Sequence, residues 1–137
     1  MPTVPKTARP EFRNIGLGDI LRYRMPLAAI VSILHRISGA LMFVLLPVVL
    51  WAFELSLRSA QGFADVASVL GSWPMKLVGL VLFWGLAQHF CAGIRHLISD
   101  ICPRVVTKQA GRRSAVTVLV VSLLATLLVA IHLFSGA

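Results

Sequence analysis

The chain has 137 residues, of which 58% are hydrophobic and only 13% are charged, against about 25% charged residues in an ordinary globular domain. Its mean hydropathy of +0.87 excludes a water-soluble fold. The net charge of +8 does not indicate nucleic-acid binding, because the basic residues flank the apolar segments and form no single patch. That distribution is the one that sets membrane topology. We therefore expect residues 1–137 to form a single, all-α membrane domain.

Three apolar segments are long enough to cross a membrane, whose hydrocarbon core is about 30 Å thick and needs about 20 helical residues. They follow a basic arm, residues 1–24, in which we expect a short surface helix around residues 18–23. The predicted transmembrane helices are residues 26–57, 74–100 and 115–134, with another short helix expected between the first two. Pro47 is expected to kink the first span.

The basic residues predict the orientation of these spans. Five Lys and Arg residues lie in the arm up to Arg24 and four lie in residues 101–114. The connection between the first two spans carries Arg58, with Lys76 at its edge. Because Lys and Arg are enriched in cytoplasmic loops, we expect the N-terminus in the cytoplasm and the C-terminus on the outer, periplasmic side.

The first span carries a polar stripe near its basic end. Residues three and four apart share a helix face, so one face holds Ser32, His35, Arg36 and Gly39. A charged side chain at the centre of a lipid-facing helix costs roughly 2.5–3.5 kcal/mol on insertion scales. Arg36 therefore needs a partner such as an acidic side chain, a cofactor carboxylate or a polar ligand. An anion or a quinone carbonyl suits its guanidinium.

A second polar stripe occupies one face of the second span. Its members are two glycines and two histidines: Gly85, His89, Gly93 and His96. Small residues beside a histidine allow another helix or a flat ligand to approach closely. At 1.5 Å per residue, His35 and His89 each lie roughly 15 Å from the basic end of their helix. We therefore expect the two histidines to meet in one layer with Ser32 and Arg36.

Other chemistry in the sequence is sparse, with no nucleophilic triad, phosphate-binding loop or Cys/His zinc spacing. His96 and Asp100, four residues apart, are expected to pair, and His132 is expected at the opposite interface. A histidine in a membrane bundle serves as a haem ligand, a proton relay, a ligand contact or an interhelical hydrogen-bond partner. Periodicity alone leaves His89 open between a haem ligand and an interhelical hydrogen bond.

Two motifs resemble those of the cytochrome b556 membrane anchor of succinate dehydrogenase. Residues 32–39, Ser-Ile-Leu-His-Arg-Ile-Ser-Gly, are similar to its S-I/V-x-H-R-x-S/T-G motif. Residues 89–96, His-Phe-Cys-Ala-Gly-Ile-Arg-His, followed by Asp100, resemble its H-x-x-x-G-I/L-R-H-x-x-x-D motif. Both motifs stand in the family's order and on the corresponding spans. The resemblance extends from about Arg9 to the end of the third span.

This resemblance implies half of the haem-containing heterodimeric anchor of succinate:quinone oxidoreductase, an electron-transport complex of the respiratory chain and tricarboxylic acid cycle in the bacterial inner membrane. Its partners would be a flavoprotein, an iron–sulfur protein and a second small anchor subunit. His89 would be an axial ligand of a b-type haem iron, with the other axial histidine supplied by the second anchor. Ser32 and Arg36 would line the ubiquinone pocket, and His35 and Arg36 would face the haem propionates. The chain would carry no catalytic residue of its own.

Two other interpretations remain from the residues. A self-contained b-type cytochrome would use His35 and His89, at matched depth, as both axial ligands of one haem. A non-catalytic small membrane protein, such as an assembly factor or a transporter subunit, would use its histidines as interhelical contacts and Arg36 in a salt bridge.

Overall fold

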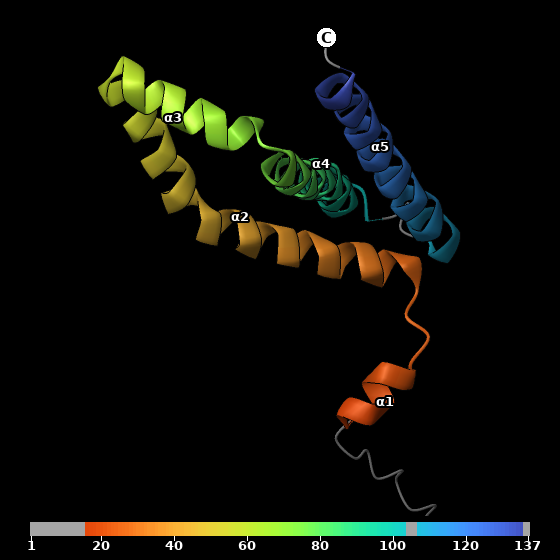
Figure 1. The fold of residues 1–137 in the computed structure, drawn as a ribbon. Helices are drawn as coiled ribbons and strands as arrows, with labels where there is room; N and C mark the ends of the chain where they lie inside the picture. The colour runs from red at the N-terminus through yellow and green to blue at the C-terminus, as the bar shows by residue number, and fades with distance from the viewer. Residues whose placement is uncertain (1–15, 104–106, 136–137) are drawn as a thin grey trace, which may run out of the picture.

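The computed structural model describes residues 16–103 and 107–135, and these residues form helices without strands. The helices are α1 (Leu17–Arg22), α2 (Leu27–Arg58), α3 (Ala60–Gly71), α4 (Trp73–Ile101) and α5 (Lys108–Phe134) (Figure 1). Three of them, α2, α4 and α5, are long and apolar enough to cross a membrane. The prediction of an all-α membrane protein with three transmembrane helices is therefore confirmed. Most of the predicted arm lies outside the described residues, although α1 occupies its end.

A single polar residue, Ser59, separates α2 from α3. The chain becomes extended at Ser59, after the end of α2, and the Ser59 hydroxyl accepts a hydrogen bond of 3.0 Å from the N–H of Gly62. Side-chain acceptors at this position satisfy amide groups that a helix start leaves unpaired. This cap begins α3, which is the short helix expected between the first two spans.

Helix α5 begins seven residues before the predicted start of the third span at residue 115. The Thr107 hydroxyl accepts from the N–H of Ala110 at 3.1 Å and caps the helix. Lys108, Gln109 and Ala110, which follow the cap, are all good helix formers. The sequence prediction relied on apolar residues, so it found only the part of α5 that lipid can cover. The first two turns of α5 are polar and basic and were missed.

Helix α4 packs against both α2 and α5, and α2 also contacts α5. The buried apolar side chains of this junction are small: Val31 of α2, Ala92 of α4, and Ala115 and Val118 of α5. All four lie toward the basic ends of their helices. From this junction α2 and α5 diverge (Figure 1), which leaves most large apolar side chains exposed for contact with lipid or partner chains.

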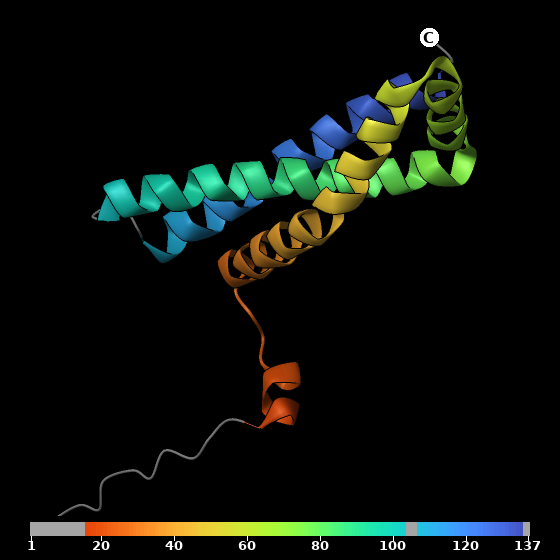
Figure 2. The same ribbon diagram turned by 90° about the vertical axis from the view of Figure 1, so that its left-hand side faces the viewer.

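Helix α2 is bent in its second half, as both views show (Figure 2). Pro47 is the proline inside this helix, and an internal proline removes a main-chain hydrogen bond and clashes with the preceding turn. The bend turns the end of α2 toward α3, which packs against α2 and leads back to α4. It lies beyond the polar stripe and leaves that part of α2 straight.

Candidate functional site

Two histidines from different helices meet where α2 crosses α4. The rings of His35 and His89 stack with their centroids 4.0 Å apart and their planes 17° from parallel. The crossing is close because glycines face each ring. A Cβ atom on Gly39 would stand 2.8 Å from Cε1 of His89, and one on Gly93 would stand 3.5 Å from Nε2 of His35. The structure therefore brings together the histidine layer that helix depth predicted.

The Nδ1 atom of His89 is held by α2. It lies 2.8 Å from the main-chain oxygen of His35 and 3.2 Å from the hydroxyl oxygen of Ser38. A carbonyl oxygen only accepts hydrogen bonds, so Nδ1 carries the proton in this contact and Nε2 keeps a lone pair. Metal-ligating histidines are oriented in the same way, by a hydrogen bond from the ring nitrogen that does not bind the metal.

Two polar residues that the sequence analysis did not single out support this arrangement. The Ser38 hydroxyl donates to the main-chain oxygen of His35 at 3.0 Å and lies 3.5 Å from Oε1 of Gln88. The Gln88 side chain, 1% exposed, donates to the main-chain oxygen of Val31 at 3.3 Å. Both residues were visible as polar interruptions of apolar spans, Ser38 inside the first motif and Gln88 directly before the second. Which helix each one faced was not readable from the sequence.

A third imidazole extends the cluster toward the end of α4. The ring of His96 lies 5.2 Å from that of His35 and is tilted by 50°. The predicted pairing of His96 with Asp100 is not observed: both side chains are described, and neither an ion pair nor a hydrogen bond joins them. Asp100 is exposed while His96 packs against His35. His132 is exposed near the far end of α5, consistent with an interfacial position.

Ser32 and Arg36 lie on the same stretch of α2 but outside this hydrogen-bonded cluster. Ser32 is half-buried and Arg36 is exposed on the surface of the bundle. Within the described part of the chain, neither side chain makes a hydrogen bond or an ion pair. A guanidinium at this depth needs a polar partner. The position of Arg36 leaves it open to one from outside this chain.

In this arrangement Nε2 of His89 could bind a haem iron, whereas His35 as placed here could not bind the same iron from the opposite side. Nδ1 of His89 is hydrogen-bonded to α2 and Nε2 keeps the lone pair that such a bond requires, and Gly39 leaves the space that the His89 ring occupies. Carbon atoms are already in contact at about 3.5–4.0 Å, so no macrocycle fits between two rings stacked at 4.0 Å. The described residues also contain no group of three His, Cys, Asp or Glu side chains placed to hold a metal ion.

Comparison with known protein sequences places this chain in a family. The sequence profile of the succinate dehydrogenase/fumarate reductase transmembrane subunit family matches residues 13–129. The chain belongs to this family. It is 33% identical over 118 residues to the succinate dehydrogenase cytochrome b556 subunit of Coxiella burnetii, which covers 85% of this chain and 93% of the relative.

Two further relatives carry the same name. The subunit of Paracoccus denitrificans is 34% identical over 92 residues, covering 67% of this chain and 71% of the relative. That of Rickettsia prowazekii is 29% identical over 79 residues, covering 58% and 60%. These matches confirm the resemblance that the two motifs indicated. The chain is a multi-pass membrane subunit of the succinate dehydrogenase type.

Proposed function

We propose that this chain is one of two small anchor subunits of a succinate:quinone oxidoreductase, and that His89 provides an axial bond to a b-type haem iron. The observation that carries the proposal is the contact of His89 Nδ1 with the main-chain oxygen of His35, 2.8 Å away. Since His35 as placed here could not bind the same iron across a 4.0 Å stack, a second histidine ligand would be supplied by the other anchor subunit. This distance also argues against the self-contained cytochrome.

Other residues of α2 and α4 would hold the haem in position. His35 and Arg36 would face its propionates, which would give the Arg36 guanidinium the anionic partner that its depth in the membrane demands. Gly39 and Gly93 keep bulk away from the two imidazoles. When bound, a bis-histidine haem has no open coordination position, so it carries or buffers electrons and does not bind oxygen.

Ser32 and Arg36 line the ubiquinone site in this proposal. They are four residues apart and so share a face of α2, and the exposure of Arg36 leaves that face free for the iron–sulfur subunit. The Ser32 hydroxyl hydrogen-bonds a quinone oxygen, and the Arg36 guanidinium stabilises the negative charge that develops as the quinone is reduced. Fixed charges act strongly in a water-poor site of this kind. Electrons reach the quinone from the iron–sulfur subunit, which receives them from the flavoprotein.

The complex lies in a bacterial inner membrane with the N-terminus of this chain in the cytoplasm. The basic ends of the helices support this orientation. Arg22 and Arg24 precede α2, and Lys108, Arg112 and Arg113 lie in the first turns of α5. Helices α2, α4 and α5 pack closely against one another at this same end. The histidine cluster, which lies where α2 crosses α4, is therefore in the cytoplasmic half of the membrane.

The test is to purify the native assembly in mild detergent, identify the co-purifying chains and record a reduced-minus-oxidised visible spectrum. We expect a flavoprotein, an iron–sulfur protein, a second small membrane subunit and a b-type haem band. His89→Ala removes that band, whereas His132→Ala, at the exposed far end of α5, retains it. A colourless assembly, or an unchanged pigment in His89→Ala, contradicts the proposal and favours a non-catalytic membrane protein.

A further inference from the structure

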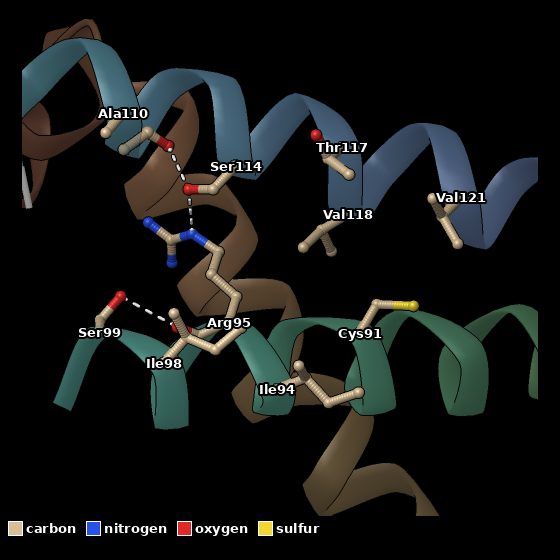
Figure 3. A pocket seen from close by; sticks show the side chains of 11 residues that line it. Cys91, Ile94, Arg95, Ile98, Ser99, Ala110, Ser114, Thr117, Val118 and Val121 are labelled. Atoms are coloured by element: carbon tan, nitrogen blue, oxygen red, sulfur yellow. Dashed lines mark hydrogen bonds between the residues drawn. The ribbon is translucent and has the colours of Figure 1, made fainter. Parts of the chain in front are cut away.

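A groove separate from the histidine cluster runs between α4 and α5 (Figure 3). Its volume is about 370 Å³. One part of its lining is apolar, with Ile94, Ile98, Val118 and Val121, and polar groups lie toward the basic end, with Arg95, Ser99 and Ser114. The groove is on the side of α4 that faces α5, whereas Gly85, His89, Gly93 and His96 of α4 face α2. It therefore belongs neither to the haem site nor to the quinone site proposed above.

The charged group of this groove is the guanidinium of Arg95. Its Nε donates to the hydroxyl of Ser114 at 3.0 Å, and that hydroxyl donates to the main-chain oxygen of Gly111 at 3.2 Å. A guanidinium has five N–H donors, and within the described residues the bond to Ser114 is the one that the Arg95 guanidinium makes. Figure 3 shows its two terminal nitrogens lying between the helices. No acidic side chain lines the groove.

The depth of Arg95 matches the boundary between lipid headgroups and hydrocarbon. It lies six residues before the end of α4 and Ser114 lies six residues after the start of α5. Six residues correspond to about 9 Å of helix. The apolar segment of α5 begins directly after Ser114. A ligand on this guanidinium would thus have its polar end among headgroups and its apolar part beside the hydrocarbon core.

More positive charge surrounds the polar end of the groove. Arg112 and Arg113 line an adjoining hollow on α5, and Thr117 lines both the hollow and the groove. Lys108 is exposed one turn earlier. The rim therefore attracts anions and repels the ammonium group of a zwitterionic lipid, whereas the apolar walls suit an acyl chain.

We propose that the groove between α4 and α5 binds one anionic phospholipid, with its phosphate on Arg95 and an acyl chain along Ile94, Val118 and Val121. Phosphate oxygens accept paired hydrogen bonds from a guanidinium. Basic pockets between transmembrane helices are known sites for anionic headgroups. The lipid ties the end of α4 to the start of α5 beside the buried junction, without a part in haem or quinone binding.

The experiment is native mass spectrometry of the intact assembly with phosphatidylglycerol and, separately, with phosphatidylcholine. Two variants disturb the site in different ways. Arg95→Gln removes the charge, and Gly111→Phe adds bulk at the polar end, where a Cβ meets nothing within 4 Å. The matched controls are Arg24→Gln, an arginine of the exposed arm, and Gly79→Phe, another position where a Cβ meets nothing within 4 Å.

We expect the unmodified assembly to prefer phosphatidylglycerol and Arg95→Gln to weaken its retention about fivefold, the size expected for one cation at a membrane surface. Gly111→Phe is expected to weaken the retention as well, because its side chain fills the polar end of the groove. The two controls keep the preference. Equal retention of both lipids, or an Arg95→Gln variant that binds phosphatidylglycerol as before, overturns the proposal. Either result leaves Arg95 as an interhelical contact to Ser114.

A crosslinking measurement keeps the proposal testable if a site variant fails to assemble. Val121 lines the groove and is 46% exposed, so benzoylphenylalanine in its place samples the occupant directly. A lipid adduct that is displaced by excess phosphatidylglycerol supports the site. An adduct to another protein chain shows that a partner helix fills the groove and refutes a lipid.

Discussion

Nδ1 of His89 on α4 lies 2.8 Å from the main-chain oxygen of His35 on α2. The acceptor is part of the backbone, so it survives any ordinary substitution at position 35. The two residues are also linked by their stacked rings, and this second link is lost when the side chain is removed. The main-chain oxygen of His35 therefore orients the His89 ring, whereas the His35 side chain packs against it.

His35→Ala is expected to keep a low-spin b-type spectrum, because the main-chain acceptor for His89 remains. Loss of the stacked ring and of a propionate contact weakens haem retention by a few-fold, a hydrogen bond being worth about 0.5–1.5 kcal/mol. The measurement is the visible spectrum and the haem-to-protein ratio of the purified assembly. A change to a high-spin spectrum would identify His35 as an axial ligand and restore the self-contained cytochrome.

Gly39→Ala is expected to displace the His89 ring, since a Cβ would stand 2.8 Å from its Cε1 atom. Overpacking of this kind costs about 1–3 kcal/mol, so both the thermal stability of the assembly and its haem content fall. The control is Gly79→Ala, where a Cβ meets nothing within 4 Å and Ala is the better helix former. If the two variants had the same thermal stability and haem content, Gly39 would not be needed to make space for the His89 ring.

Ser38→Ala is expected to retain haem but raise its midpoint potential. The hydroxyl lies 3.2 Å from Nδ1 of His89, and hydrogen bonding at that nitrogen raises the basicity of the ligand, which favours the oxidised iron. A neutral hydrogen bond is worth about 0.5–1.5 kcal/mol, and 59 mV corresponds to a tenfold change for one electron. A rise of a few tens of millivolts in a redox titration is the predicted result, and an unchanged or lower potential contradicts it.

Arg36→Leu is expected to lower quinone reduction by at least tenfold, as is typical when a group that stabilises developing charge is removed. Succinate oxidation with an artificial acceptor stays largely intact, because that reaction ends before the membrane subunits. The two rates are measured on the same preparation. Equal loss in both assays argues against a quinone role, and the exposed Arg24→Leu substitution controls for the lost charge.

Several features of this protein follow from local sequence alone. The number of spans depends on hydropathy over about 20 consecutive residues. The predicted orientation depends on the Lys and Arg residues that directly flank these spans. The shared face of His89, Gly93 and His96 follows from the helical repeat. Motif positions 32–39 and 89–96 predicted the family, which the comparisons confirmed.

The arrangement between helices was decided by tertiary structure. Helix depth predicted that His35 and His89 would share a layer, but only the crossing of α2 and α4 showed that their rings stack and that a backbone oxygen holds Nδ1. Ser38 and Gln88 became part of the site for the same reason. The helical repeat gives the direction of a side chain relative to the axis of its own helix. Which residue that side chain contacts depends on how its helix packs against a second helix. Arg95 shows the difference: it is a motif residue that turns away from the histidines and toward α5.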